Sequence, residues 1–433
     1  MYLVSVWGGK LLLKLLRLTG QGGAALPGLI VERIYPRFLN RVAKQLGWGA
    51  ILVTGTNGKT TTTKLIAGML EAEGHLLVRN RSGSNMSRGI VSAFLEHVRW
   101  SGRLRQDMAL FEVDEAFMGD VAAKLRPRVV VVLNLLRDQL DRYGELDRTA
   151  ELIAAGLKYT QQAVLNADDP LVAQMAGAVN SGSALFFGAV PELKVQLPHD
   201  EQLHQRPRKR PVAKRTGAPT SKLNLLLTKT KLTPDGQRFT YEYAGRVYQA
   251  RLQLPGIYNA YNAAAALTCV TVVGLALTRA NASIVQVPPA FGRSELVEVG
   301  GRQLRLLLVK NPAGFNQIIS TFLVSRPAPT LMAVNDNFAD GRDVSWLWDV
   351  DFEALSSFKP ALLVTGIRAY DLAVRLKYAD ITCSAEPALD KALRTFIKQL
   401  APGDTGYIVP SYTAMVGLRK LLAKQADIKE VWE

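Results

Sequence analysis

A run of glycine, threonine and lysine links an apolar segment to a helix-forming one near the start of the chain. It reads TGTNGKTT, residues 54–61, with a predicted strand at residues 50–53 and a predicted helix at residues 61–73. Glycines let the backbone turn tightly and present N–H groups to a phosphate, a lysine bridges terminal phosphate oxygens, and a threonine hydroxyl reaches Mg²⁺. Val53 stands where the common P-loop pattern has its first glycine, so we interpret the run as a P-loop variant.

Apolar, β-branched runs then alternate with helix-length segments. The predicted strands are residues 108–113, 129–133 and 163–165. This alternation is typical of a parallel sheet and predicts a doubly wound α/β domain. With 48% hydrophobic and 21% charged residues in 433, the composition excludes disordered, collagen-like and disulfide-scaffold chains.

Changes in composition and hydrophobic pattern along the sequence predict three regions. Residues 1–48 form an amphipathic helical segment, residues 49–299 the ATP-binding domain, and residues 300–433 a smaller Rossmann-like α/β domain. An insertion at about 188–255 contains the basic loop RPRKRPVAKR, residues 206–215, and a small antiparallel hairpin. The predicted strands of that hairpin and of the last domain are residues 238–243, 247–252, 304–309, 331–334, 361–365 and 406–409, and a helix is predicted at residues 261–273.

The N-terminal segment is too short and too often broken by charge to span a membrane. Lys10, Lys14 and Arg17 interrupt its leucines every three or four positions. Two interpretations stay open: the helix packs against the body of the protein, or it contacts a membrane surface.

The net charge predicts the kind of partner, and the cysteine content predicts the cellular location. The net charge of +16 predicts an anionic partner, which nucleic acid, nucleotide, phospholipid or a pyrophosphate-bearing substrate would each satisfy. The basic loop either steers the chain to such a partner or is an inert solvated loop. The two cysteines, Cys269 and Cys383, lie far apart in the sequence, which favours a reducing, cytoplasmic location.

Acidic and amide residues follow three of the predicted strands. Glu112 is our first candidate for a metal ligand, with Asp114 and Glu115 as alternates; the competing interpretation is a solvated strand end. Residues 134–144 are expected at the same edge of the sheet. Two interpretations stay open for residues 166–170, NADDP. They bind a ribose or support the loop, or they form only a simple Asx turn.

These segments, together with GIYNAYN at residues 256–262, resemble the central ATPase domain of the Mur ligases. The resemblance implies that ATP activates a carboxylate as an acyl phosphate, which an amine then attacks. It also implies that Lys59 is catalytic, that Thr60 and Glu112 hold Mg²⁺, that Asn262 lies near adenine, and that Arg293 lies near the ribose or the terminal phosphate. The residues that it assigns to the phosphates are Gly55, Thr56, Asn57, Gly58, Lys59, Thr60 and Thr61.

Two features depart from the amino-acid-adding members of that family. Fewer than 55 residues precede the P-loop, which predicts that the N-terminal domain holding the uridine nucleotide is missing. Gln139 and Ala154 stand where those ligases carry a histidine and a carbamylated lysine, so a second metal site is not supported.

The C-terminal part resembles one subgroup, the MurT family of synthetase subunits of lipid II isoglutaminyl synthase. The resemblance rests on residues 310–316, 335–337, 340–349 and 411–415. It implies amidation of the D-glutamate α-carboxylate of lipid II with ammonia from a GatD-type class I glutaminase, in the cytoplasm and in possible peripheral contact with the membrane. Lys310 and Asn311 are added to the expected nucleotide site.

The resemblance further implies that one aspartate of the last domain orients the partner's catalytic histidine. We favour Asp349 because tryptophans flank it, and Asp343 comes second; the full set is Asp336, Asp340, Asp343, Asp349 and Asp351. No histidine neighbours either cysteine in the sequence, so this chain is not expected to hydrolyse glutamine itself. Zinc is not predicted, because residues 188–255 contain no cysteine and His199 and His204 are expected to be solvated.

Three alternatives remain open at this point. One is an amino-acid-adding ligase of the muropeptide or folylpolyglutamate kind. Another is a basic P-loop protein that binds nucleic acid, although the sequence has no motif of that kind, and nucleic acid is not among the expected partners. The third is a scaffold relative that has lost catalysis.

Overall fold

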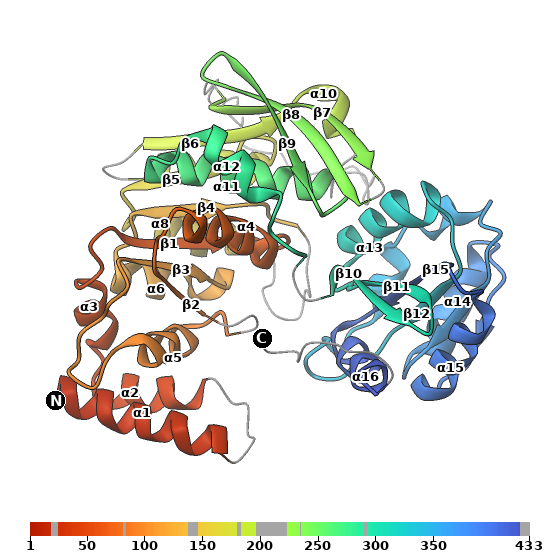
Figure 1. Cartoon of the computed structure of the whole chain (residues 1–433), viewed down its shortest axis with the longest axis horizontal. Coiled ribbons are helices and arrows are strands. Elements are labelled where there is room, and N and C mark those ends of the chain that lie inside the picture. Colours follow the sequence, from red (N-terminus) through yellow and green to blue (C-terminus); the bar gives the residue numbers. More distant parts are fainter. Residues whose placement is uncertain are drawn as a thin grey trace, which may run out of the picture.

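The computed structural model describes residues 1–18, 25–80, 84–136, 146–179, 183–195, 223–233, 235–289 and 292–424. Two α/β units, each built on one sheet, make up most of the chain, and a helical N-terminal segment packs on the first unit (Figure 1). Residues 137–145 and 196–222, which include Gln139, the basic loop and His199 and His204, lie outside the described residues.

The first sheet has nine strands in the order β2-β3-β1-β4-β5-β6-β7-β8-β9. The pairs from β2 to β7 are parallel, and β7-β8-β9 are antiparallel. The strands are β1 (Gly49–Thr54), β2 (Leu77–Arg79), β3 (Met108–Glu112), β4 (Val129–Val132), β5 (Gln162–Asn166), β6 (Ser183–Ala189), β7 (Leu225–Thr233), β8 (Gly236–Tyr243) and β9 (Arg246–Leu252). The predicted α/β fold class is therefore confirmed, with a mixed rather than purely parallel sheet.

Helices cover both faces of this sheet, which explains why its strands read as continuous apolar runs. In β4, Val129 and Val131 join one buried cluster, while Val130 and Val132 join the cluster on the opposite face. The first cluster contains α4 (Lys59–Ala72), α11 (Ile257–Val273) and α12 (Leu277–Ile284), and the second contains α5 (Ser87–His97), α6 (Met118–Leu125), α8 (Leu146–Leu157) and α9 (Pro170–Gln174).

The predicted antiparallel hairpin is confirmed, because β8 and β9 cover its two expected strands and pair with each other. The sequence did not predict that β8 also pairs with β7, which in turn pairs with β6. The segment therefore extends the central sheet by three strands. Phe239 and Tyr241 of β8 are buried in the same cluster as α11, so the meander contributes to the main core.

The second unit contains a six-stranded sheet in the order β10-β11-β15-β12-β13-β14. Its strands are β10 (Arg293–Val299), β11 (Arg302–Leu307), β12 (Thr330–Ala333), β13 (Leu362–Thr365), β14 (Ser384–Ala385) and β15 (Thr405–Pro410). Its α-helices are α13 (Pro312–Ile318), α14 (Ala369–Tyr378), α15 (Leu389–Gln399) and α16 (Tyr412–Leu422). Because β10 pairs with β11, the second sheet begins at residue 293 rather than at the predicted boundary of 300.

The N-terminal segment forms α1 (Tyr2–Leu18), α2 (Leu26–Ile34) and α3 (Phe38–Ala43). Tyr2, Val6, Val31 and Phe38 are buried in the same cluster as α5, so these helices pack on the first unit. Among the described residues, no helix combines the length and the apolar character needed to cross a membrane.

Candidate active site

The P-loop joins β1 to α4, as the sequence predicts, and its geometry requires glycine at two positions. Gly55 has φ +126° and Gly58 has φ +91°, both in the region that side chains rarely adopt. A Cβ on Gly58 would lie 2.1 Å from Asn262 Oδ1, and one on Gly55 would lie 3.0 Å from the backbone N of Asn134. The loop is therefore packed between α11 and the segment after β4.

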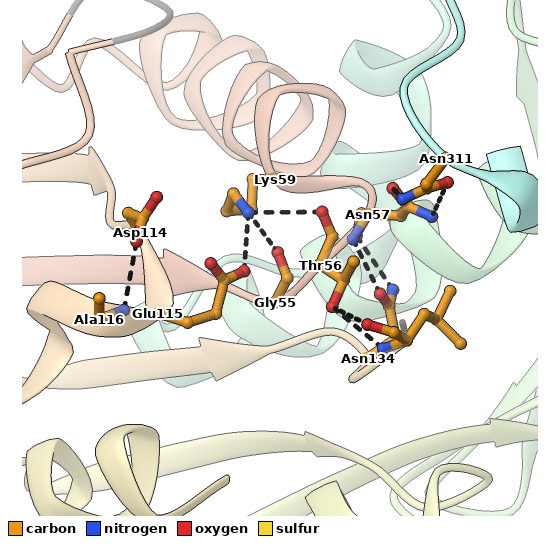
Figure 2. Close-up of polar contacts among 10 residues, drawn as sticks. Gly55, Thr56, Asn57, Lys59, Asp114, Glu115, Ala116, Asn134 and Asn311 are labelled. Carbon is orange, nitrogen blue, oxygen red and sulfur yellow. Dashed lines mark hydrogen bonds and ion pairs between the residues drawn. The ribbon is translucent and has the colours of Figure 1, made fainter. Parts of the chain in front are cut away.

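Asn134 fixes the shape of the loop through hydrogen bonds (Figure 2). The Asn57 N–H donates to Asn134 Oδ1 at 2.9 Å, and Asn134 Nδ2 donates to the Asn57 carbonyl at 3.0 Å. The Thr56 N–H donates to the Asn134 carbonyl, and the Thr56 hydroxyl exchanges hydrogen bonds with the backbone of Leu136. Asn134 thus lies at the P-loop, as expected for residues at this edge of the sheet.

Lys59, the first residue of α4, has its ammonium group inside the loop. Its Nζ donates to Glu115 Oε1 at 2.8 Å, to the Gly55 carbonyl at 2.5 Å and to the Thr56 carbonyl at 3.4 Å (Figure 2). Burial alone lowers the pKa of Lys59, but the neighbouring carboxylates, Glu115 foremost, outweigh it and hold the pKa above its ordinary value. The side chain is therefore a permanent cation at neutral pH.

Glu112 ends β3 beside this cation and is only 4% exposed. Asn80 fixes its backbone from both sides: the Glu112 N–H donates to Asn80 Oδ1, and Asn80 Nδ2 donates to the Glu112 carbonyl. Glu112 Oε1 is buried and has no hydrogen-bond partner within the described part of the chain. A buried carboxylate oxygen without a partner is costly unless a cation or donor joins it.

Magnesium suits these groups. It prefers oxygen ligands and is commonly held by one or two protein oxygens plus substrate phosphates. The unpartnered Glu112 oxygen, with Thr60 in the first turn of α4, offers that donor set. The described residues contain no cluster of three metal-binding side chains, so the phosphates of a nucleotide would have to complete the coordination.

Arg293 lies near both Glu112 and Tyr258, which come from other elements. Burial lowers the pKa of the Arg293 guanidinium, and the charges of Tyr258 and Glu112 oppose that effect. Burial also raises the pKa of Tyr258, which lies in the first turn of α11. Since Arg293 begins β10, the second sheet contributes a cation to the region of the P-loop.

Asn311 makes a direct contact between the second unit and the P-loop (Figure 2). Asn311 Nδ2 donates to Asn57 Oδ1 at 3.1 Å, and Asn57 Nδ2 donates to Asn311 Oδ1 at 3.4 Å. Asn311 Oδ1 also accepts from the Gly314 N–H and so caps α13. The neighbouring Lys310 lies over the Tyr412 ring, 5.7 Å from its centroid.

The NADDP segment supports the site by hydrogen bonding. Asp169 caps α9 and accepts from the Leu135 N–H, next to Asn134. Asp168 pairs with Lys194 and accepts from the Tyr261 hydroxyl. Asn166 Oδ1 accepts from the Asp168 N–H, as in an Asx turn. Both carboxylates thus have structural partners, which favours the turn and loop-support interpretation over ribose binding.

Sequence reasoning missed two contributors. Asn80 was not singled out, although asparagine after a short strand indicates local backbone bonding. Glu115 was named only as an alternate metal ligand, whereas the structure pairs it with Lys59. No sequence signal separates Glu112, Asp114 and Glu115, because only the turn after β3 decides which carboxylate reaches the lysine.

The candidate aspartates of the second unit divide into two groups. Three of them have hydrogen-bonding partners: Asp336 pairs with Arg368, Asp340 bonds Thr413, and Asp343 accepts from the Ser345 N–H, which lowers the pKa of Asp343. Asp349 and Asp351 are exposed. The Trp348 ring beside Asp349 is also exposed, and its centroid lies 5.4 Å from that of Tyr378.

Neither cysteine has the environment of an activated nucleophile. Burial raises the pKa of the Cys269 thiol, and it also raises that of Cys383. Both thiols are therefore protonated and weakly reactive at neutral pH.

Family models match two parts of the chain. The Mur ligase middle domain matches residues 53–192, and MurT ligase C-terminal matches residues 308–415. The lipid II isoglutaminyl synthase (glutamine-hydrolyzing) subunit MurT of Streptococcus pneumoniae is 30% identical over 431 residues, covering 94% of each chain. The protein of the same name from Staphylococcus aureus is 30% identical over 389 residues, covering 86% of each chain.

Solved structures show the same fold. The MurF ligase from Thermotoga maritima, determined in complex with ADP, superposes with a TM-score of 0.67 at 14% identity. The match covers 91% of this chain and 84% of that one. At this identity the likeness establishes the fold, and it agrees with the family assignment of the middle region.

Proposed function

The chain belongs to the MurT family of Mur ligases, and we propose that it is the ATP-dependent synthetase subunit of a lipid II isoglutaminyl synthase. In this role it amidates a peptidoglycan precursor, converting the D-glutamate α-carboxylate of lipid II to the amide of D-isoglutamine. The observation that carries the proposal is the P-loop, in which Lys59 stays charged beside the N-terminus of α4.

The first step of the proposed reaction is phosphoryl transfer. A carboxylate oxygen of the substrate attacks the γ-phosphorus of ATP, the bond between that phosphorus and the β–γ bridging oxygen breaks, and ADP leaves. The loop N–H groups, the N-terminus of α4 and the Lys59 ammonium stabilise the negative charge on the transferred group. Glycine at positions 55 and 58 keeps the backbone close enough to act in this way.

The second step replaces phosphate by nitrogen. Ammonia attacks the carbonyl carbon of the acyl phosphate, phosphate leaves with the electrons of the C–O bond, and the nitrogen releases a proton. Mg²⁺, held by Thr60 and Glu112 when the nucleotide is bound, would neutralise phosphate charge.

A partner glutaminase supplies the ammonia in this proposal. The protonated state of Cys269 and Cys383 argues against glutamine hydrolysis by the chain itself. Asp349 is our candidate for the residue that orients the partner's histidine, because its carboxylate is exposed and lies beside the exposed Trp348. Asp343 is less suited, since its carboxylate already accepts from the Ser345 N–H.

Substitution of Lys59 tests the phosphoryl-transfer site. We expect Lys59→Ala to abolish ATP-dependent amidation of lipid II while the chain still binds the glutaminase. Lys231→Ala, a change on the exposed side of β7, is the matched control and should retain activity. Activity in Lys59→Ala comparable to that of the control would contradict the proposal.

Substitution of Asp349 tests the partner role separately. Asp349→Asn should abolish glutamine-dependent amidation but leave the rate with ammonium chloride unchanged, while Asp343→Asn should retain both. Loss of both rates in Asp349→Asn would assign this residue to the synthetase reaction instead. Stimulation of ATP hydrolysis by an amino acid, rather than by ammonium, would favour an amino-acid-adding ligase.

The proposed location is the cytoplasm, at the inner face of the membrane. Lipid II is a lipid-anchored substrate, so a subunit that modifies its peptide must work close to the bilayer.

A further inference from the structure

The solvent-facing side of α1 is apolar, which is unusual for a helix on the surface of a globular protein. One side of α1 packs on the protein body through Tyr2, Val6 and Leu13. The opposite side is formed by Val4, Trp7, Leu11 and Leu15, which are 58%, 48%, 57% and 52% exposed. Their spacing of three or four residues aligns them in one stripe.

The neighbouring helix α2 adds a second set of exposed apolar side chains. Leu26, Leu29, Ile30 and Ile34 are all exposed, although Val31 of the same helix is buried. The helices α1 and α2 contact each other and lie side by side at the far end of the first unit from β7–β9 (Figure 1). We call the exposed set the apolar face: Val4, Trp7, Leu11, Leu15, Leu18, Leu26, Leu29, Ile30 and Ile34.

Such a concentration of exposed apolar side chains marks an interaction surface. Single exposed leucines are ordinary on soluble proteins, but a group of this size on two adjoining helices is not. Leaving it in water forgoes the free energy that burial of these side chains would release.

The basic residues near the apolar face indicate which kind of partner it binds. Residues 1–44 contain seven basic residues and a single acid, Glu32, and that acid is paired with Lys124. Lys10 and Lys14 lie over the Trp100 ring, at 5.7 and 5.4 Å from its centroid, beside the exposed stripe. The indole N–H of Trp7 donates to the Trp100 carbonyl, so an indole with a satisfied N–H faces outward.

A cationic, apolar surface with outward tryptophan has the properties of an interfacial membrane helix. Anionic headgroups attract its lysines and arginines, and the acyl region accepts the leucines and isoleucines. A second copy of this chain is a poorer partner, because its equivalent face has the same sign of charge. We propose that the apolar face binds the surface of a bilayer that contains anionic phospholipid.

This inference rests on the proposed function only for its biological purpose, which is to hold the active site near lipid II. Its test contains neither ATP nor lipid II, so the two proposals can fail separately.

The experiment measures co-sedimentation of the full chain with vesicles of phosphatidylcholine alone or with one quarter phosphatidylglycerol. We expect the wild type to bind the phosphatidylglycerol vesicles, and to bind them less tightly as salt is raised. Two double variants, Leu11→Gln/Leu15→Gln on α1 and Leu29→Gln/Ile30→Gln on α2, should each bind at least about tenfold more weakly.

Val247→Gln/Leu296→Gln is the matched control, since it removes two exposed apolar side chains from β9 and β10. It should bind vesicles like the wild type. Circular dichroism checks that each variant is folded, and ATP hydrolysis should be unchanged in the two helix variants.

Three outcomes would overturn the proposal. The first is failure of the wild type to sediment with phosphatidylglycerol vesicles even at low salt. The second is binding of both double variants as tight as that of the control. The third is a wild-type dimer, seen by sedimentation velocity without lipid, that Leu11→Gln/Leu15→Gln dissociates while no vesicle binding is seen, which would assign the face to a second copy.

Discussion

Asn57 of the P-loop and Asn311 of the second unit form a reciprocal amide pair, with donor–acceptor distances of 3.4 and 3.1 Å. The two residues are 254 positions apart in the sequence. Because Asn311 also caps α13, the position of the loop is coupled to the start of a helix in the other unit. The contact links the proposed nucleotide site to the unit that contains the candidate aspartates.

Asn311→Asp separates the two roles of this side chain. A carboxylate still accepts from the Gly314 N–H, so we expect the thermal stability to stay close to that of the wild type. It cannot donate to Asn57, and its charge opposes phosphate binding, so kcat/KM for ATP should fall by about tenfold. Asn311→Ala removes both the contact with Asn57 and the cap of α13. Its kcat/KM for ATP should therefore fall as well, and its free energy of unfolding should drop by about 1 kcal/mol because the cap is missing. Equal kcat/KM values for wild type and Asn311→Asp would show that the pair has no role in nucleotide use.

Glu115→Gln tests the charge state of Lys59. Without this carboxylate, the lowering effect of burial is opposed only by Asp114 and Glu112, so the pKa of Lys59 should fall. The proposed reaction needs the protonated lysine, and the alkaline limb of the pH–rate profile should therefore move to lower pH than in the wild type. Glu71→Gln, which removes an exposed carboxylate from α4, is the control.

The ion pair between Lys59 and Glu115 also contributes to the stability of the fold. The folded-state pKa of Lys59 is raised, so its contribution is fully present below the unfolded pKa and is lost as pH rises through the folded value, above 10.5. At pH 7, Glu115→Gln should lower the free energy of unfolding by about 1–3 kcal/mol, measured by urea denaturation. An unchanged stability and an unchanged alkaline limb would together contradict the pairing.

Gly58→Ala and Gly245→Ala compare two glycines that both have positive φ, +91° and +74°. Nothing lies within 4 Å of a Cβ on Gly245, so that variant should lose only about 1 kcal/mol from backbone strain. A Cβ on Gly58 would meet Asn262 at 2.1 Å, which should add about 1–3 kcal/mol and weaken ATP binding. Thermal unfolding and nucleotide titration measure the two effects; equal losses in both variants would mean that Asn262 moves aside freely.

Glu112→Gln tests the proposed magnesium ligand. The amide keeps the shape of the side chain but loses the charge that a divalent cation requires, so the Mg²⁺ concentration for half-maximal rate should rise by at least about tenfold. The KM for lipid II should change little, because Glu112 is proposed to contact only the metal. A Mg²⁺ dependence identical to that of the wild type would exclude Glu112 as a ligand.

Local sequence signals predicted a feature correctly where the residues that carry its chemistry and those that set its backbone geometry are adjacent in the chain. The P-loop between 54 and 61 was predicted on its strand and helix, because glycine, lysine and threonine at this spacing serve one purpose. The apolar runs of β3, β4 and β5 were predicted because strands covered on both faces carry apolar residues without interruption. The resemblance to the Mur ligases followed from the order of the motifs, the resemblance to the MurT family followed from the C-terminal segments 310–316, 335–337, 340–349 and 411–415, and both are confirmed.

The hydrophobic pattern of the sequence did not predict strands that lack a continuous apolar run. β7 was not predicted, since Leu225–Thr233 follows a long basic stretch and continues from three leucines into alternating threonine and lysine, which resembles a solvated segment. Its pairing with β6 and β8 depends on backbone hydrogen bonds that residue types do not specify. The start of β10 was also missed, because Arg293, Glu295 and Glu298 interrupt the apolar residues of this edge strand with charge.

The sequence by itself determined the kind of chemistry: a phosphate loop with a lysine, carboxylates at the ends of strands, and no activated thiol. Only the tertiary structure decided which groups meet. Lys59 takes Glu115 rather than its neighbours, Asn57 meets Asn311, and the outer side of α1 faces solvent without cover. The reason is that backbone propensities act over a few residues, whereas a hydrogen bond or an ion pair depends on distances that chain folding sets across hundreds of positions.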